Sequence, residues 1–137
     1  MNTETSKCVV LADRHYGVIE GIDGLLKTTF ATVVMVTDEN SLIESASRMQ
    51  PAVVVADLSV AGGGGFGWLG RLLGKSLGSK VIVLSVHDEP SVVQSALEAG
   101  ASGFVLKRAI ATDLLNAVDV VLAGGRYVSP AIPLPGH

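Results

Sequence analysis

The sequence predicts an α/β fold built on a parallel sheet. Five short apolar runs rich in Val, Leu, Ile and Ala alternate along the chain with five segments whose apolar residues recur at helical spacing. Hydrophobic residues make up 48% of the 137 residues but aromatic residues only 4%, a balance typical of strands that helices cover on both faces. A chain of this length can bury one core without disulfides or metals, so one domain is expected.

Three strands and two helices are expected in the first part of the chain. The strands are predicted at residues 8–12, 32–36 and 53–56. The helix after the first strand has apolar residues at helical spacing, but glycines lower its intrinsic propensity, so packing on the sheet must stabilise it. The next helix is expected to open at Ser41-Leu42-Ile43-Glu44, which has the pattern of a capping box, and to end before Pro51.

Two strands and three helices follow. The strands are predicted at residues 81–84 and 104–106, and the helix before the first of them has Phe66, Leu69, Leu72 and Leu73 on one face. Asp88-Glu89-Pro90 begins the next helix, and Gly100 ends it. The last helix runs over residues 110–122 and ends at Gly124-Gly125.

The ends of the chain differ from the domain between them. Residues 1–6 are polar and are expected to be disordered, residues 7–124 form the domain, and residues 125–137 form a C-terminal linker or tail. Pro130, Pro133 and Pro135 cannot sustain a helix, so the tail is expected to be extended.

Composition excludes several classes of function. The net charge is -3 and the basic residues are scattered, so the chain alone is expected to bind nucleic acid poorly. Cys8 is the only cysteine and lies in a predicted strand, which favours a buried hydrophobe over a disulfide or metal ligand. No apolar run approaches the ~18 residues of a membrane span, so a cytoplasmic protein without a membrane partner is expected.

Polar residues follow four of the predicted strands at the point where each strand ends: Asp13, Asp57, Ser85 and Lys107. The carboxyl ends of parallel strands share one edge of the sheet, where open α/β folds bind ligands. A carboxylate such as Asp57 can attack phosphorus and form an acyl phosphate, provided that a cation such as Lys107 meets the phosphoryl oxygens. Ser85 would add a hydroxyl donor there.

Each of these residues also has a structural interpretation. An Asp at a strand end is often a helix cap or a turn former, which applies to Asp57 and to Asp13. Ser85 can simply bond to the backbone. Phe104, three residues before Lys107, is read as a core residue from its position alone.

The sequence resembles the receiver domain of two-component response regulators over residues 7 to about 129. The segments that carry the resemblance are Val9-Val10-Leu11-Ala12-Asp13, Val54-Val55-Ala56-Asp57-Leu58-Ser59, Val83-Leu84-Ser85-Val86-His87-Asp88 and, most specifically, Ala96-Leu97-Glu98-Ala99-Gly100-Ala101-Ser102-Gly103-Phe104-Val105-Leu106-Lys107. Together with Gly124-Gly125-Arg126-Tyr127-Val128-Ser129-Pro130, they are similar to the subfamily whose receivers precede a LuxR/NarL-type helix-turn-helix domain.

The resemblance implies a flavodoxin-like (βα)5 fold, doubly wound, with a five-stranded parallel sheet in the order 2-1-3-4-5. It implies that Asp57 accepts a phosphoryl group from a sensor histidine kinase and thereby switches an output. The remaining roles it implies are Mg²⁺ binding by Asp13, Asp57 and the backbone carbonyl of Ser59, contact with the phosphoryl group by Lys107, and switching by Ser85 and the aromatic Phe104.

The implied activity is signalling and not enzymatic turnover, beyond self-catalysed phosphoryl transfer and autodephosphorylation. The output is expected to be LuxR-type transcription regulation, with DNA contacted only through a helix-turn-helix domain outside this chain; a homodimer is a further expected state. The alternative is a degenerate receiver that acts as a dimerisation or protein-interaction module without phosphorylation. Arg14 favours this alternative, whereas the presence of Asp57, Ser85 and Lys107 opposes it.

Arg14 is the main departure from the family pattern, because receivers usually carry two adjacent acids after the first strand. Asp13 and Asp57 would then face two cations, Arg14 and Lys107, and Mg²⁺ binding is expected to be weak or absent. Two arrangements remain open: the guanidinium forks onto Asp57, or it extends into solvent and leaves the pocket one ligand short.

The loop at residues 60–65 departs as well, since it has four consecutive glycines where a Met-Pro-Gly stretch is usual, and we expect it to be mobile. Residues 62–67 satisfy G-x-G-x-x-G, but a dinucleotide-binding fingerprint follows the first strand and this one follows the third. A hydrolase is not favoured, because the sequence shows neither a nucleophile elbow nor a triad that contains His. His15 and His87 are expected to lie only at the periphery of the pocket.

Overall fold

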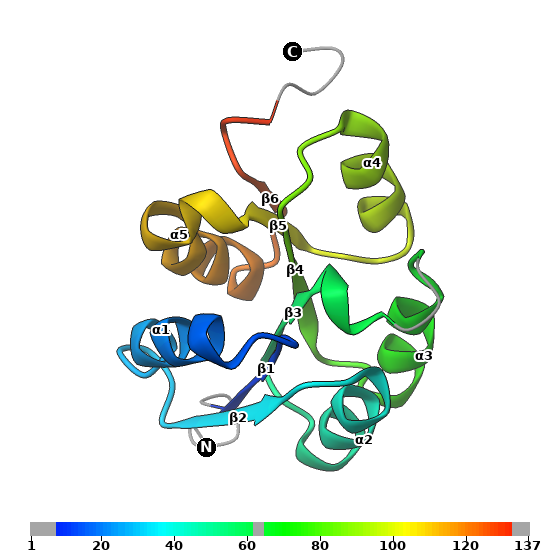
Figure 1. Cartoon of the computed structure of the whole chain (residues 1–137). Coiled ribbons are helices and arrows are strands. Elements are labelled where there is room, and N and C mark those ends of the chain that lie inside the picture. The colour runs from blue at the N-terminus through cyan, green and yellow to red at the C-terminus, as the bar shows by residue number, and fades with distance from the viewer. Residues whose placement is uncertain (1–7, 62–64, 133–137) are drawn as a thin grey trace.

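A parallel sheet between two layers of helices forms the molecule (Figure 1), of which the computed structural model describes residues 8–61 and 65–132. The strands are β1 (Cys8–Ala12), β2 (Thr32–Val36), β3 (Val53–Asp57), β4 (Lys80–Ser85), β5 (Gly103–Leu106) and β6 (Tyr127–Val128). The helices are α1 (Tyr16–Leu26), α2 (Glu39–Met49), α3 (Gly67–Lys75), α4 (Pro90–Glu98) and α5 (Ile110–Leu122), with short 3₁₀ turns η2 (Leu58–Val60) and η3 (Lys107–Ala109).

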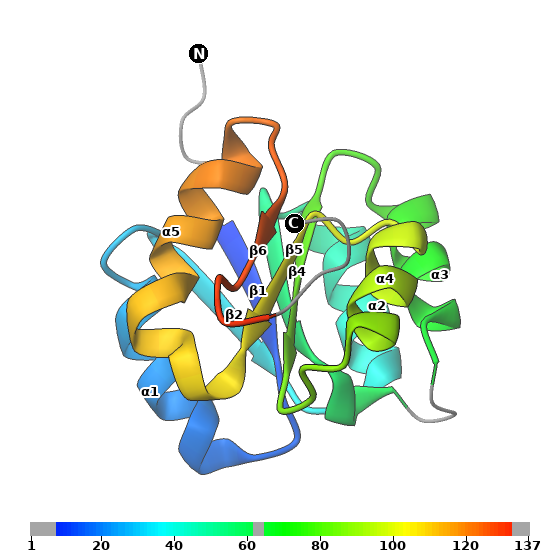
Figure 2. The same cartoon turned by 90° about the horizontal axis from the view of Figure 1, so that it is seen from above.

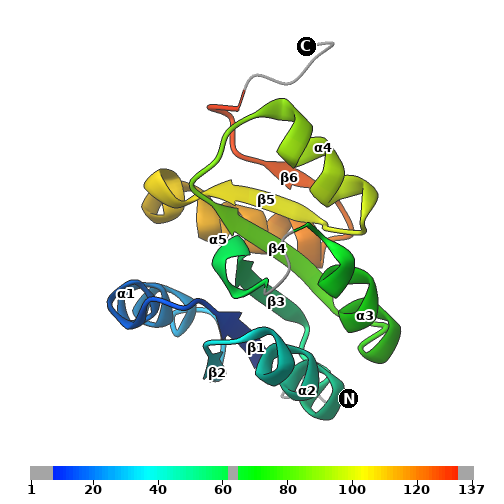
Figure 3. The same cartoon turned by 45° about the vertical axis from the view of Figure 1, so that its right-hand side comes forward.

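The sheet has the order β2-β1-β3-β4-β5-β6, with every neighbouring pair parallel (Figure 3). The predicted flavodoxin-like class and the order 2-1-3-4-5 are therefore confirmed. The structure adds a sixth strand, because Tyr127 and Val128 pair with Gly103 and Phe104 at the free edge of β5. The residues from which we expected only an extended linker thus begin by completing the sheet.

Two hydrophobic cores lie on opposite faces of the sheet, and alternate residues of the central strands point into each. Figure 2 shows α1 and α5 on one face and α2, α3 and α4 on the other. The strand residues that face α1 and α5 are Val9, Leu11, Val53, Val55, Ile82, Leu84 and Val105. Those that face the other three helices are Val10, Ala12, Val54, Ala56, Val81, Val83, Phe104 and Leu106. Because both faces are covered, the strands read as unbroken apolar runs.

The start of α2 differs from the prediction. The helix begins at Glu39 and not at Ser41, because Asp38 is its N-cap: the Asp38 carboxylate accepts a hydrogen bond from the Ser41 amide at 2.8 Å. Asp is among the strongest N-cap residues, and its side chain satisfies an amide of the first turn that has no helical partner. Ser41 is therefore inside the helix, and the proposed capping box was placed three residues too late.

The end of α4 depends on Gly100. Its φ of +117° lies where L-residues are strained, and a Cβ there would be 2.6 Å from Cδ1 of Leu73 on α3. Glycine therefore lets the chain leave α4 and enter β5 while α3 packs closely beside it.

Three further predictions concern the sequence ends, the glycine loop and Cys8. Residues 1–7, 62–64 and 133–137 lie outside the described residues, so the predicted disorder of residues 1–6 and mobility of the glycine loop stay predictions. Cys8 is buried and free, as expected, and burial raises the pKa of its thiol. Among the helices described, none combines the length and the apolar character that a bilayer crossing requires.

Candidate functional site

Four polar residues lie at the carboxyl edge of the sheet, where the strand register brings them level. Asp13 directly follows β1, Asp57 ends β3, Ser85 ends β4 and Lys107 directly follows β5. Ala12 pairs with Ala56, Asp57 with Leu84, and Ser85 with Leu106, so the four strands end at similar heights. The structure thus brings together the residues that the sequence placed at one edge.

Lys107 joins the two carboxylates of this edge. Its Nζ lies 2.8 Å from Oδ2 of Asp13 and 3.0 Å from Oδ1 of Asp57. Burial alone would lower the pKa of Lys107, but the hydrogen bonds and negative charges of Asp13 and Asp57 outweigh burial, so the pKa is raised. The ammonium group is therefore charged at neutral pH and directed at Asp57.

Asp57 is 4% exposed and has one partner for each oxygen. Oδ1 pairs with Lys107, and Oδ2 accepts a hydrogen bond from the Ser59 amide at 2.8 Å. Asp57 is also the N-cap of η2, so the structural role of a turn former and the proposed chemical role coexist in one residue. These contacts fix the orientation of the carboxylate at the sheet edge.

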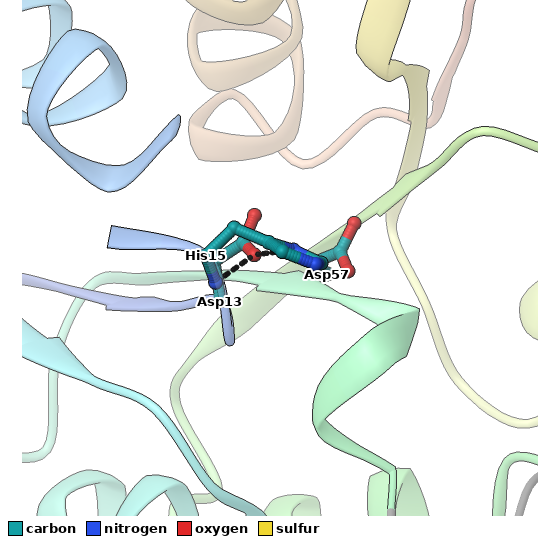
Figure 4. Close-up of side chains that lie close together, drawn as sticks. All are labelled: Asp13, His15 and Asp57. Carbon is teal, nitrogen blue, oxygen red and sulfur yellow. Dashed lines mark hydrogen bonds and ion pairs between the residues drawn. The ribbon is translucent and has the colours of Figure 1, made fainter. Parts of the chain in front are cut away.

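His15, which the sequence places at the periphery of the pocket, contacts Asp13, although its side chain is 65% exposed. Its amide donates to Oδ1 of Asp13 at 2.9 Å, and its Nδ1 lies 3.1 Å from the same oxygen. Figure 4 shows the imidazole extending from Asp13 toward Asp57, and one ligand atom from each of the three residues lies within 4.8 Å of the others. The available signal was the position of His15, two residues after Asp13, at the start of a helix whose N-cap it forms.

Arg14 extends away from this group. It is exposed, and it forms no hydrogen bond or ion pair with any other residue in the part of the chain that the structure describes. The cation that pairs with Asp57 is Lys107. Of the two arrangements considered for Arg14, this structure has the one in which the guanidinium leaves the pocket.

Ser85 and Phe104 occupy different surroundings. Ser85 is 1% exposed, and its hydroxyl oxygen accepts a hydrogen bond from the His87 amide at 2.9 Å. Phe104 is fully buried in the core on the α2–α4 side of the sheet. The structural interpretations of both residues therefore hold in this conformation, and their switch roles stay predictions.

A cavity of about 260 Å³ opens above Asp57. Its polar lining comes from His15, Asp57, Ser59, Ser85, His87 and Lys107. The Ser59 Oγ is buried and has no hydrogen-bond partner among the described residues. The cavity therefore combines a carboxylate, an ammonium group and hydroxyl groups, which suits a small oxyanion next to Asp57.

The donor set at this edge fits a divalent ion only weakly. Asp13, His15 and Asp57 could each offer one ligand atom. Mg²⁺ prefers an octahedron of oxygen ligands, whereas one ligand atom here is an imidazole nitrogen and the Lys107 ammonium already contacts both carboxylates. Arg14 stands where a second acid is usual, so that position supplies no further carboxylate ligand. The residues can therefore hold a cation, but with fewer oxygen ligands than Mg²⁺ favours.

Comparison with protein families gives one match over most of the chain. The sequence model of the response regulator receiver domain matches residues 9–119. This range contains all four polar residues of the sheet edge.

Two curated relatives that are similar over nearly the whole chain are transcriptional or response regulators. The transcriptional regulatory protein DegU of Brevibacillus brevis is 32% identical over 126 residues, which cover 90% of this chain and 53% of that protein. The nitrate/nitrite response regulator protein NarL of Escherichia coli K12 is 31% identical over 136 residues, which cover 96% of this chain and 62% of that protein. The chain thus spans only about half to three fifths of the length of these relatives.

Solved structures have the same architecture. A two-component response regulator of the LuxR family from Aurantimonas sp. SI85-9A1 matches with a TM-score of 0.83 and 28% identity, covering 91% of both chains. The isolated REC domain of RcsB from Salmonella enterica serovar Typhimurium, solved in the presence of the phosphomimetic BeF₃⁻, matches with a TM-score of 0.81 and 26% identity, covering 93% of this chain and 96% of that one.

Proposed function

We propose, since the chain belongs to the response regulator receiver family, that Asp57 accepts a phosphoryl group from a sensor histidine kinase. The chain is a receiver domain of the LuxR/NarL type of two-component response regulator. The single observation that carries the proposal is the Asp57 carboxylate, fixed 3.0 Å from the Lys107 ammonium beside a cavity at the carboxyl edge of the sheet.

The proposed reaction transfers the phosphoryl group from a phosphohistidine to Asp57. A carboxylate oxygen of Asp57 forms a bond to phosphorus while the phosphorus–nitrogen bond of the donor breaks, and the imidazole of the donor keeps the electron pair and takes up a proton. Lys107 stays charged throughout and stabilises the negative charge on the transferred oxygens. Ser85 donates its hydroxyl hydrogen to one of these oxygens, and its own acceptor oxygen remains bonded to the His87 amide.

A metal ion would be held weakly in this chain. Asp13, Asp57 and the backbone carbonyl of Ser59 are the residues proposed to bind Mg²⁺, which would supply positive charge to the phosphoryl oxygens. Within the described part of the pocket, the side-chain charges of Asp13, Asp57 and Lys107 sum to -1, because Arg14 extends outward. Lys107 therefore supplies a larger share of the positive charge than in a site with a further acid and a tightly bound ion.

The output, location and partners of the whole protein are proposed from its relatives. The relatives include transcriptional regulators that are longer than this chain, which supports an output by transcription regulation through a domain outside it. A cytoplasmic location, a homodimeric state and DNA contact through a helix-turn-helix domain are proposed on the same basis.

Intact-mass spectrometry after incubation with acetyl phosphate tests the proposal. The wild-type chain is expected to gain the mass of one phosphoryl group, and Asp57→Ala is expected to gain none. Asp88→Ala serves as the matched control, because Asp88 is an exposed acid in the loop between β4 and α4 and should leave the uptake unchanged. Equal uptake by the wild type and Asp57→Ala would overturn the assignment of the acceptor.

A further inference from the structure

A buried serine joins the segment after α5 to β5 by hydrogen bonds. Ser129 is 1% exposed, and its amide donates to the carbonyl of Phe104 at 3.0 Å. Its hydroxyl oxygen accepts a hydrogen bond from the Leu106 amide at 3.0 Å. Ser129 therefore binds β5 at two points, and its side chain continues the hydrogen-bond ladder one step beyond the end of β6.

Asp113 on α5 fixes the orientation of this hydroxyl. The Ser129 hydroxyl donates to Oδ2 of Asp113 at 2.8 Å, and Oδ1 of Asp113 accepts from the Thr112 hydroxyl at 3.2 Å. Asp113 is 9% exposed, which is unusual for a carboxylate that forms no ion pair among the described residues. With its hydrogen directed at Asp113, the Ser129 hydroxyl is free to accept from Leu106.

The arrangement bears on the site because Leu106 is the residue directly before Lys107. The backbone that carries Lys107 therefore has a partner on its outer side, at the edge of the sheet where β5 would otherwise leave an amide unpaired. Figure 2 shows β6 beside β5 at this edge, next to α5. The opposite end of the Lys107 side chain is the ammonium group that contacts Asp13 and Asp57.

We propose that Ser129, oriented by Asp113, is a positioning residue of the phospho-acceptor site, because it fixes the end of β5 that carries Lys107. The inference rests on the proposed phosphorylation of Asp57. A contact between two elements acts in both directions, so a change in the position of Lys107 also alters the bonds of Ser129. The Ser129 contacts thereby couple the segment at residues 127–132 to the state of Asp57.

Ser129→Ala tests the inference, with Ser102→Ala as the matched control. Ser102 lies just before β5, and its hydroxyl forms no hydrogen bond with another described residue. The rate of labelling by acetyl phosphate is expected to fall on the order of tenfold in Ser129→Ala. The fall is moderate because the Lys107 ammonium is displaced in this variant and not removed. Ser129→Thr, which keeps the hydroxyl, is expected to recover most of the rate, and Ser102→Ala to keep all of it.

Amide NMR signals give a second readout that does not require phosphorylation. Ser129→Ala is expected to shift the signals of Lys107 and Asp57, whereas Ser102→Ala leaves them in place. If Ser129→Ala does not fold, Asp113→Asn replaces it in both measurements, with the same signals expected to move. A folded variant with an unchanged labelling rate and unchanged Lys107 signals overturns the inference. If the wild type takes up no label, the proposed function fails, and the Lys107 signals still decide the positioning role.

Discussion

At the scale of the residue, Lys107 connects the parts of the site. It is the described cation that contacts both buried carboxylates, and its side chain is only 14% exposed. Without it, Asp13 and Asp57 would face each other across the site without a counter-charge. A buried charge that loses its partner is costly, so Lys107 is expected to matter for folding stability as well as for phosphoryl transfer.

Lys107→Met is expected to lower the free energy of unfolding at pH 7 by about 3 kcal/mol, the lower end of the range for a buried ion pair that loses one partner. The pKa of Lys107 is raised in the folded state, so its stabilising contribution is complete below its ordinary value of 10.5 and is lost as the pH rises through the higher folded value. Urea unfolding of the wild type and Lys107→Met between neutral and alkaline pH measures this. Equal stability of the wild type and Lys107→Met at pH 7 would contradict the expectation.

Arg14 gives a prediction at the same scale. Labelling of the wild type by acetyl phosphate is expected to change little when Mg²⁺ is removed, because the pocket lacks the second acid. Arg14→Asp adds a carboxylate beside Asp13 and should make labelling clearly faster with Mg²⁺ than without it.

Arg48→Asp controls for the altered net charge, since Arg48 is exposed and lies on α2. Its labelling should have the same Mg²⁺ dependence as that of the wild type. Fast labelling of the wild type that requires Mg²⁺ would contradict the proposed weak site.

At the scale of the element, the structure depends on a few backbone positions. Gly100 is one, because it ends α4 with a φ of +117° and lies against Leu73 of α3. Gly21 in α1 is different, since its φ is not positive and a Cβ there would meet no atom within 4 Å apart from the neighbouring backbone of its own helix. Replacement by alanine should therefore change the free energy of unfolding in opposite directions at these two glycines.

Gly100→Ala is expected to lower the free energy of unfolding by about 2–4 kcal/mol, from backbone strain and contact with Leu73. Gly21→Ala is expected to raise it by about 0.5–1 kcal/mol, because alanine loses less entropy in a helix. Chemical denaturation of both variants measures the two effects. A Gly100→Ala protein as stable as the wild type would contradict the packing described for α4 and α3.

At the scale of the whole molecule, the class and the meeting of Asp13, Asp57, Ser85 and Lys107 could be predicted from the sequence, because short apolar runs followed by polar residues are strong local signals. The strand order came from the resemblance to receiver domains and not from these local signals. It did not predict β6, a two-residue strand whose stability comes from the edge of β5 and from the Ser129 contacts. Such a strand has no periodicity of its own.

The site was harder to predict in its side-chain detail. The contact of His15 with Asp13 depends on where α1 begins, and helix ends are the least certain part of a sequence-based prediction. The direction of Arg14 depends on rotamers of a long side chain, which no sequence pattern fixes. The contacts of Lys107, in contrast, follow from the strand register.

The central claim is that the carboxylate of Asp57 receives the phosphoryl group, and reduction by borohydride tests it most directly. Borohydride reduces an acyl phosphate but not a free carboxylate, so it converts a phosphorylated aspartate to homoserine. After treatment with acetyl phosphate and borohydride, peptide sequencing by mass spectrometry is expected to find homoserine at position 57 in the wild type and no conversion in Lys107→Met or without acetyl phosphate. Homoserine at Asp13 or Asp88 instead, or unreduced aspartate at every position, would contradict the claim.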